Sequence, residues 1–323
     1  MIMDKYLDYI LEQMKTLLAI DSPSGYTQKV TDYLMAEYQR LGYHLLEAHV
    51  DTLGAMVSEI KGNGRLKVTP IGGMNANNAE GENCRIVTRF GGIYEGTCQL
   101  INASVHVNGD YDKTGRTFDT VEIVPDEPAA DKEAVAALGI SPGDYVCFAP
   151  RTVITRSGYI KSRFLDDKLS AAILLGYAKY VREEGISLKK RVYQHMTVFE
   201  EVGHGGASSI PDGVKDVISV DMGCVGEGLC CTEQQVSICA KDSRGPYHYD
   251  LVTSLVKTAR DMGLAYAVDV YPHYGSDADV ALTAGYDVRH GLIGPGVYAS
   301  HGYERSHVEG VKNTLLLIKG LLG

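Results

Sequence analysis

Two adjacent carboxylates, Glu200 and Glu201, stand between an apolar run and a glycine-rich turn. Residues 197–199 are β-branched or aromatic, which is typical of the end of a buried strand. Neighbouring side chains on a strand point to opposite faces, so the two glutamates can do different jobs. One can hold a metal ion while the other faces a water molecule. A solvated pair of glutamates before a loop is the alternative.

Three further positions carry side chains that can bind a metal. His49 can ligate through one ring nitrogen, and Asp51 shares its face on a strand and can fix the tautomer. Asp166 stands just before a predicted helix, where it can serve as a helix cap or as a carboxylate shared by two metals. Asp221 follows the apolar run 217–220, at the end of another predicted strand. The alternative is that His49 is a surface histidine and that the aspartates are ordinary turn or cap residues.

The last histidine of the set is either His301 or His307. With it, the chain supplies one histidine and one terminal carboxylate for each of two divalent ions, plus one shared aspartate. Zinc accepts nitrogen and oxygen ligands of this kind, and cobalt or manganese would also fit.

Apolar periodicity predicts the elements that position these residues. Helices are expected at 6–18, 30–41, 169–182, 247–262 and 308–322, and strands at 43–48, 55–60, 191–199, 217–220, 236–240 and 265–270. In open α/β sheets ligands gather outside the carboxyl ends of the strands. The fold class is therefore α/β, with a central mixed sheet flanked by helices.

The segment 62–156 has a different texture, with frequent glycines and short β-rich runs at 86–88, 105–107, 120–123 and 145–148. A short helix is expected within 126–138. Because candidate site residues lie on both sides, we interpret 62–156 as an inserted β-rich domain. Residues 1–61 and 157–323 then form the catalytic domain.

Composition excludes several classes of protein. The 323 residues are 45% hydrophobic and 22% charged, as in ordinary globular proteins, and the net charge is −10. The chain has no basic block that would indicate nucleic-acid binding, and it contains no run of 18 apolar residues long enough to span a membrane. The N-terminus lacks the features of a signal peptide. Seven cysteines without CxxC spacing predict free thiols and a cytoplasmic location.

Four motifs carry a family resemblance across essentially the whole chain: His49-Val50-Asp51, Leu165-Asp166-Asp167-Lys168, Phe199-Glu200-Glu201-Val202-Gly203 and Asp221-Met222-Gly223. In this order the sequence resembles metallopeptidase family forty-two, the tetrahedral-particle and glutamyl aminopeptidases. The resemblance implies a dizinc-exopeptidase-like fold, peptide substrates and two metal ions, and large homo-oligomers, often of twelve subunits. The inserted domain would carry a substantial share of the subunit contacts.

The resemblance also assigns roles to residues. It implies that His49 and Asp221 are metal ligands, that Asp166 bridges, and that Glu201 ligates the second metal. Glu200 would be the general base and Asp51 would orient His49. The family's terminal motif, a histidine followed by an acidic residue, fits His301 and Glu304 better than His307. A cis peptide bond is implied between Asp166 and Asp167. The stretch before His49 is shorter than the family's.

Two other functions are open. A carbohydrate hydrolase could use a carboxylate pair, but the chain has no tryptophan for sugar stacking and such a site would not need His49 and His301. A metal-bound scaffold without catalysis would be expected to have lost Glu200. Sensitivity to a chelator separates the metallopeptidase from the carbohydrate hydrolase. The preferred first residue of the substrate depends on loops such as 241–245 and is not predicted.

Overall fold

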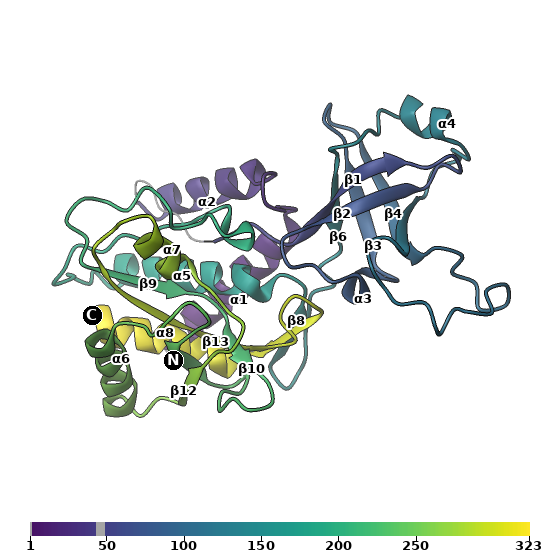
Figure 1. Cartoon of the computed structure of the whole chain (residues 1–323). Helices are drawn as coiled ribbons and strands as arrows, with labels where there is room; N and C mark the ends of the chain where they lie inside the picture. The colour runs from purple at the N-terminus through teal and green to yellow at the C-terminus, as the bar shows by residue number, and fades with distance from the viewer. Residues whose placement is uncertain (1, 43–48) are drawn as a thin grey trace. The chain divides into compact units, whose positions relative to one another are not determined.

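The computed structural model describes residues 2–42 and 49–323, and the chain divides into two compact units (Figure 1). The large unit comprises Met1–Asp51 and Arg151–Gly323, and the small unit comprises Thr52–Pro150. The boundaries predicted from sequence, 62 and 156, lie further along the chain. The difference arises because the strand predicted at 55–60 pairs with strands of the small unit.

The small unit is a closed barrel with the strand order β1-β2-β5-β4-β3-β6. Its strands are β1 (Gly54–Ile60), β2 (Leu66–Ile71), β3 (Asn83–Val87), β4 (Ile93–Leu100), β5 (Val121–Pro125) and β6 (Tyr145–Phe148), and its helices are α3 (Ala76–Ala79) and α4 (Lys132–Ala137). The strand predicted at 105–107 is wrong. Those residues form a turn in which Val105 and Val107 are 60% and 75% exposed. Alternation of valines favours a strand only where a neighbouring strand pairs with it.

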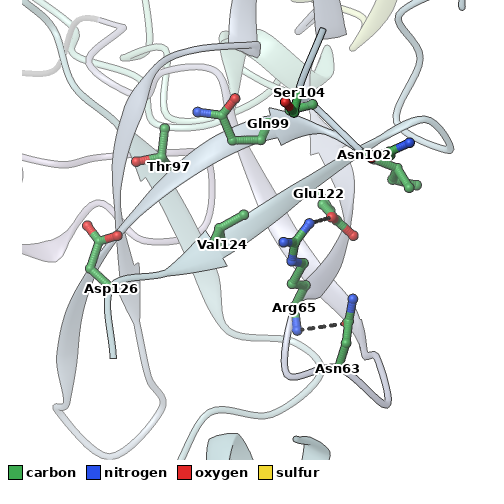
Figure 2. A pocket seen from close by; sticks show the side chains of 11 residues that line it. Asn63, Arg65, Thr97, Gln99, Asn102, Ser104, Glu122, Val124 and Asp126 are labelled. Carbon is green, nitrogen blue, oxygen red and sulfur yellow. Dashed lines mark hydrogen bonds and ion pairs between the residues drawn. The ribbon is translucent and has the colours of Figure 1, made fainter. Parts of the chain in front are cut away.

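One face of the barrel carries a polar hollow of about 670 Å³. Figure 2 shows Arg65 reaching the carboxylate of Glu122, which is almost fully buried. Lys61 also donates to Glu122, over 2.9 Å. Because the buried carboxylate is paired with two cations, its charge is already compensated.

The large unit is built on an eight-stranded mixed sheet. The path is β12-β11-β13-β14-β8-β7, with β9 and β10 also pairing with β13. The strands are β7 (Val153–Ile154), β8 (Tyr159–Ser162), β9 (Asp216–Val220), β10 (Gly223–Val225), β11 (Val236–Lys241), β12 (Tyr266–Val270), β13 (Arg289–Tyr298) and β14 (Glu304–His307). β13 runs parallel to β9 and antiparallel to β11. The predicted mixed sheet is confirmed, and its strand β13 pairs with four others.

Helices cover this sheet (Figure 1). They are α1 (Ile2–Ala19), α2 (Gln28–Arg40), α5 (Leu165–Glu183), α6 (Tyr249–Asp261), α7 (Asp277–Thr283) and α8 (Val308–Leu322). α5, α6 and α8 pack against β13, α1 packs on α5, and α7 lies on β9 and β13. Among the described residues no helix is both long and apolar enough to cross a membrane. All seven cysteines are free thiols, as predicted.

Two predicted strands precede site residues and need comment. The stretch 43–48 lies outside the described residues. The strand predicted at 191–199 is wrong, because this segment has only one isolated bridge residue and leads into a 3₁₀ turn, η1 (Glu200–Val202). Thr197 nevertheless accepts a hydrogen bond from the Val50 amide, over 3.0 Å. The segment therefore runs beside the chain that follows His49 without forming a regular ladder.

Candidate metal centre

Segments from five parts of the large unit bring their carboxylates and imidazoles together. Ligand atoms of His49, Asp166 and Glu201 all lie within 4.8 Å of one another. Asp166 comes from the start of α5, Glu201 from η1, and His49 from the segment before the small unit. His301, in the turn between β13 and β14, contacts the same group. Asp221, which follows β9, is buried nearby and interacts electrostatically with Asp166.

The carboxylate of Asp166 faces two imidazoles, one with each oxygen. Its Oδ1 lies 3.7 Å from Nε2 of His49, and its Oδ2 lies 3.6 Å from Nε2 of His301. The His301 ring also lies 3.7 Å from Oε2 of Glu201. These separations are too long for hydrogen bonds and leave room for an ion between each pair.

Asp51 organises the surroundings of His49. One oxygen lies 2.8 Å from Nδ1 of His49 and accepts the Glu200 amide at 3.2 Å. The other accepts the Ser24 hydroxyl at 2.5 Å and the Glu201 amide at 3.4 Å. One carboxylate therefore holds both the imidazole and the backbone of the two glutamates. This agrees with a side chain that fixes the histidine's tautomer and orientation.

The residues present fit a metal ion. Nε2 of His49 is buried and has no hydrogen-bond partner in the part of the chain that the structure describes. Because Asp51 accepts the proton on Nδ1, Nε2 is the ring nitrogen left to bind a metal, and it faces Asp166 and Glu200. An orphaned imidazole nitrogen among carboxylates is the donor set that zinc and similar divalent ions accept.

The two glutamates differ in depth. The Glu201 side chain is 3% exposed, whereas that of Glu200 is 18% exposed and lies 3.5 Å from Nε2 of His49 through Oε2. They separate because η1 turns about a third of a revolution per residue, not because of strand alternation. Gly203, at φ +79°, closes the turn and donates to the Glu200 carbonyl at 2.7 Å. A left-handed backbone of this kind favours glycine.

Asp221 occupies a break in the sheet. β9 and β10 keep one register against β13, since Val220 faces Ile293 and Gly223 faces Gly296. The break between them admits Asp221 because its carbonyl lies against Gly294, where an added Cβ would come within 1.4 Å of that oxygen. Only glycine allows this approach, so Gly294 lets Asp221 stand in the break between the two strands.

The cluster carries more negative charge than its own histidines balance. Burial, reinforced by Asp166, raises the pKa of Glu201 well above its usual range and that of Asp221 to about 7. Burial also raises the pKa of Glu200, although His49 opposes it. For His49, burial lowers the pKa but Asp51 and Asp166 outweigh it and hold the pKa well above normal. Divalent cations would relieve this crowding of carboxylates.

Sequence reasoning named Glu304 only as part of the terminal motif and did not predict its contacts or those of Ser300. Buried Glu304 accepts hydrogen bonds from the backbone amides of Asp166 and His301, each at 3.1 Å, and so ties two candidate ligands together. Ser300 donates to Oδ2 of Asp166 at 3.0 Å. The acidic residue after His301 was the available signal for Glu304. His307 is placed elsewhere: it is the N-cap of α8, accepts the Glu309 amide and contacts the Ser157 carbonyl.

The peptide bond between Asp166 and Asp167 is cis, as the resemblance implied.

A second buried pair of carboxylates lies outside this cluster. The Tyr247 hydroxyl contacts Asp242 at 2.8 Å and Asp279 at 3.1 Å, and Asp279 also caps α7 through Ser276. Burial and the nearby Asp279 raise the pKa of Asp242. For Asp279, burial is outweighed by hydrogen bonds with His290, Asp242 and Tyr247, which lower the pKa to about 2. Of the two carboxylates, Asp242 is thus the more easily protonated.

Comparisons with known proteins show the family and agree with the fold. The family model for M42 glutamyl aminopeptidases matches residues 40–317. The YhfE protein of Bacillus subtilis (strain 168) is 43% identical over 95% of this chain and 95% of its own length. The TET aminopeptidase of a marine-sediment Thaumarchaeota archaeon superposes with a TM-score of 0.86, at 19% identity, over 98% of this chain and 96% of that one. The TET1 peptidase of Pyrococcus horikoshii, which can assemble into a tetrahedron or a large octahedral shell, superposes with a TM-score of 0.84, at 21% identity, over 97% and 98%.

The chain belongs to the M42 glutamyl aminopeptidase family. It is therefore an aminopeptidase, a hydrolase that acts on peptides from their N-termini. Peptidases of this family are dimetal enzymes, which agrees with the cluster around Asp166.

Proposed function

We propose that the site around Asp166 holds two divalent ions and removes N-terminal residues from peptides. His49 and Asp221 would hold one ion, Glu201 and His301 the other, and Asp166 would bridge them. The observation that supports this most is the placement of Asp166 between two imidazoles, with one oxygen toward each. A carboxylate that only capped α5 would not need this arrangement.

Glu200 is the general base of this proposal. When bound, the two ions would polarise the scissile carbonyl and lower the pKa of water at the site. Glu200 accepts the proton of the attacking water and returns it to the leaving amine. Its greater exposure than Glu201 supports this role, because a general base must reach the attacking water. Asp51 keeps the Nδ1 proton on His49, which leaves Nε2 for the metal.

The proposal extends to the identity of the metal, the oligomeric state and the location of the enzyme. Zinc is the ion we favour, because it accepts mixed nitrogen and oxygen ligands, with cobalt or manganese as substitutes. We also propose a homo-oligomer, of twelve subunits as in the family resemblance, with the barrel Thr52–Pro150 supplying subunit contacts. Seven free thiols suit a reducing compartment, and we assign the enzyme to the cytoplasm.

Metal analysis combined with turnover tests the proposal. The purified chain should contain two divalent ions per subunit and cleave a panel of aminoacyl-nitroanilides. Activity should disappear with a chelator and return with zinc or cobalt. The same substrates with acetylated N-termini serve as controls and should not be cleaved. Activity that persists without metal, or equal cleavage of the acetylated substrates, would contradict the proposal.

A further inference from the structure

We propose that Tyr274 is a positioning residue for Asp221, and that its hydroxyl sets the affinity for the ion that Asp221 holds. This inference rests on the proposed function, in which Asp221 is a metal ligand. Tyr274 lies in the loop between β12 and α7, more than fifty positions from Asp221 along the chain. Neither its residue type nor its spacing from the ligand motifs marks it in the sequence.

The geometry begins with the break between β9 and β10. On its upstream side the Asp221 amide donates to the Ile293 carbonyl at 2.9 Å, in register with the sheet. The Asp221 carboxylate turns back and accepts the amide of Met222 at 2.5 Å. The two-residue break is therefore compact, and the direction of the carboxylate depends on how Met222 is held.

The Tyr274 hydroxyl holds Met222 through its carbonyl, on the other side of the residue from the amide that bonds Asp221. It donates to the Met222 carbonyl at 3.2 Å, and it is close enough to Asp221 to interact with its carboxylate electrostatically. A phenol has one hydrogen to donate, and here the Met222 carbonyl, inside the break, accepts it. The hydroxyl therefore restrains the residue that directly follows Asp221.

Tyr274 is itself fixed from two sides. Its amide donates to Oγ of Ser243 at 3.2 Å, and its carbonyl accepts the Ser243 amide at 3.2 Å. Its ring packs on Tyr271, with centroids 5.2 Å apart. Because Ser243 follows β11 and Tyr271 follows β12, the loops after two strands hold the hydroxyl in place. A preorganised donor loses little entropy when it restrains its acceptor.

The expected effect is on metal affinity. Partners of metal ligands typically contribute 10–100-fold in affinity when they orient a ligand. Tyr274→Phe keeps the ring and its packing and removes only the hydroxyl. The variant should bind one ion as the wild type does and the other about 10–100-fold more weakly. Ser243→Ala keeps the Tyr274 hydroxyl but removes the serine oxygen that anchors the Tyr274 amide. It should weaken binding of the same ion by a smaller factor.

Calorimetric titration of the metal-stripped full chain with Co²⁺ measures both affinities, and the visible spectrum of the bound cobalt reports its ligand geometry. Tyr271→Phe is the matched control, because its hydroxyl contacts Ser237 and lies in the same apolar cluster. It should bind both ions as the wild type does. Melting temperatures of the stripped proteins show whether each variant folds.

The outcomes separate the two proposals. Weakening of one ion and an altered cobalt spectrum in Tyr274→Phe alone would support the role of its hydroxyl. Unchanged affinities in Tyr274→Phe, or equal weakening in Tyr271→Phe, would overturn it. If the wild type itself fails to bind two ions, the proposed dimetal site is wrong, irrespective of Tyr274.

Discussion

Replacing Glu200 and Glu201 separately by glutamine should have different consequences, although the two residues are adjacent. Glutamine keeps the size of glutamate but removes its charge and its ability to accept a proton. Glu200→Gln should retain two bound ions, because the more exposed Glu200 serves as the base in our assignment. Its turnover should fall 10²–10⁴-fold, the typical contribution of a positioned acid–base group. At about 1.4 kcal/mol per decade this corresponds to roughly 3–6 kcal/mol in the activation barrier.

Glu201→Gln should act through the metal. The Glu201 carboxylate is almost fully buried and lies 3.7 Å from Nε2 of His301. A neutral amide is a poor replacement for a charged ligand, so the ion between Glu201 and His301 should bind more weakly. Activity should be low at stoichiometric metal and should partly recover with excess zinc or cobalt. Glu200→Gln should not respond to excess metal.

Metal analysis after gel filtration, with turnover of an aminoacyl-nitroanilide at increasing metal concentration, distinguishes the two variants. Circular dichroism of both proteins controls for misfolding. The reasoning is refuted if Glu200→Gln loses an ion while Glu201→Gln keeps two and stays inactive. That result would reverse the roles of the two side chains.

The remaining predictions concern the framework of the large unit. Gly294→Ala would place a Cβ 1.4 Å from the Asp221 carbonyl, so it should cost more than the roughly 1–3 kcal/mol typical of overpacking and should reduce bound metal. Gly226→Ala, where a Cβ meets nothing within 4 Å, is the control, and equal melting temperatures and metal contents for both would contradict this reading. Asp279→Asn should lose about 1–2 kcal/mol in urea denaturation at pH 7, because it breaks the capping box of α7. Since the pKa of Asp279 is lowered to about 2, its charge stabilises the fold above pH ~4, and the cost of the substitution should shrink as pH falls from there toward 2. Asp242→Asn should cost less than Asp279→Asn at pH 7, because burial raises the pKa of Asp242 and its charge is the less stabilised of the two; the reverse order of the two costs would contradict this.

Local sequence determined much of the fold of the large unit. Apolar residues at helical spacing predicted the helices seen as α1, α2, α5, α6 and α8, and the bounds of α8 agree at both ends. The reason is that one-sided burial imposes a period on any amphipathic helix, which neighbouring residues alone reveal. Strands were predicted less well. β13 was missed as a ten-residue strand because its glycines and proline lack β propensity, yet it pairs with four strands.

The candidate ligands were also accessible from sequence, since their residue types and motif order restrict the chemistry. The sequence could not predict the orientation of these side chains. It supplied Asp166 but not the orientation of its two oxygens toward His49 and His301. It supplied Glu200 and Glu201 on a predicted strand, whereas a 3₁₀ turn separates them.

Only the tertiary structure revealed the residues that hold the ligands. Gly294 admits the carbonyl of Asp221, Glu304 ties Asp166 to His301, and Tyr274 restrains the break after Asp221. Each of these contacts joins segments that lie far apart in the chain or depends on a side chain of ordinary type. Sequence periodicity reports how a residue is buried within its own element. The approach of one element to another is set by sheet register and by close packing, which no single segment encodes.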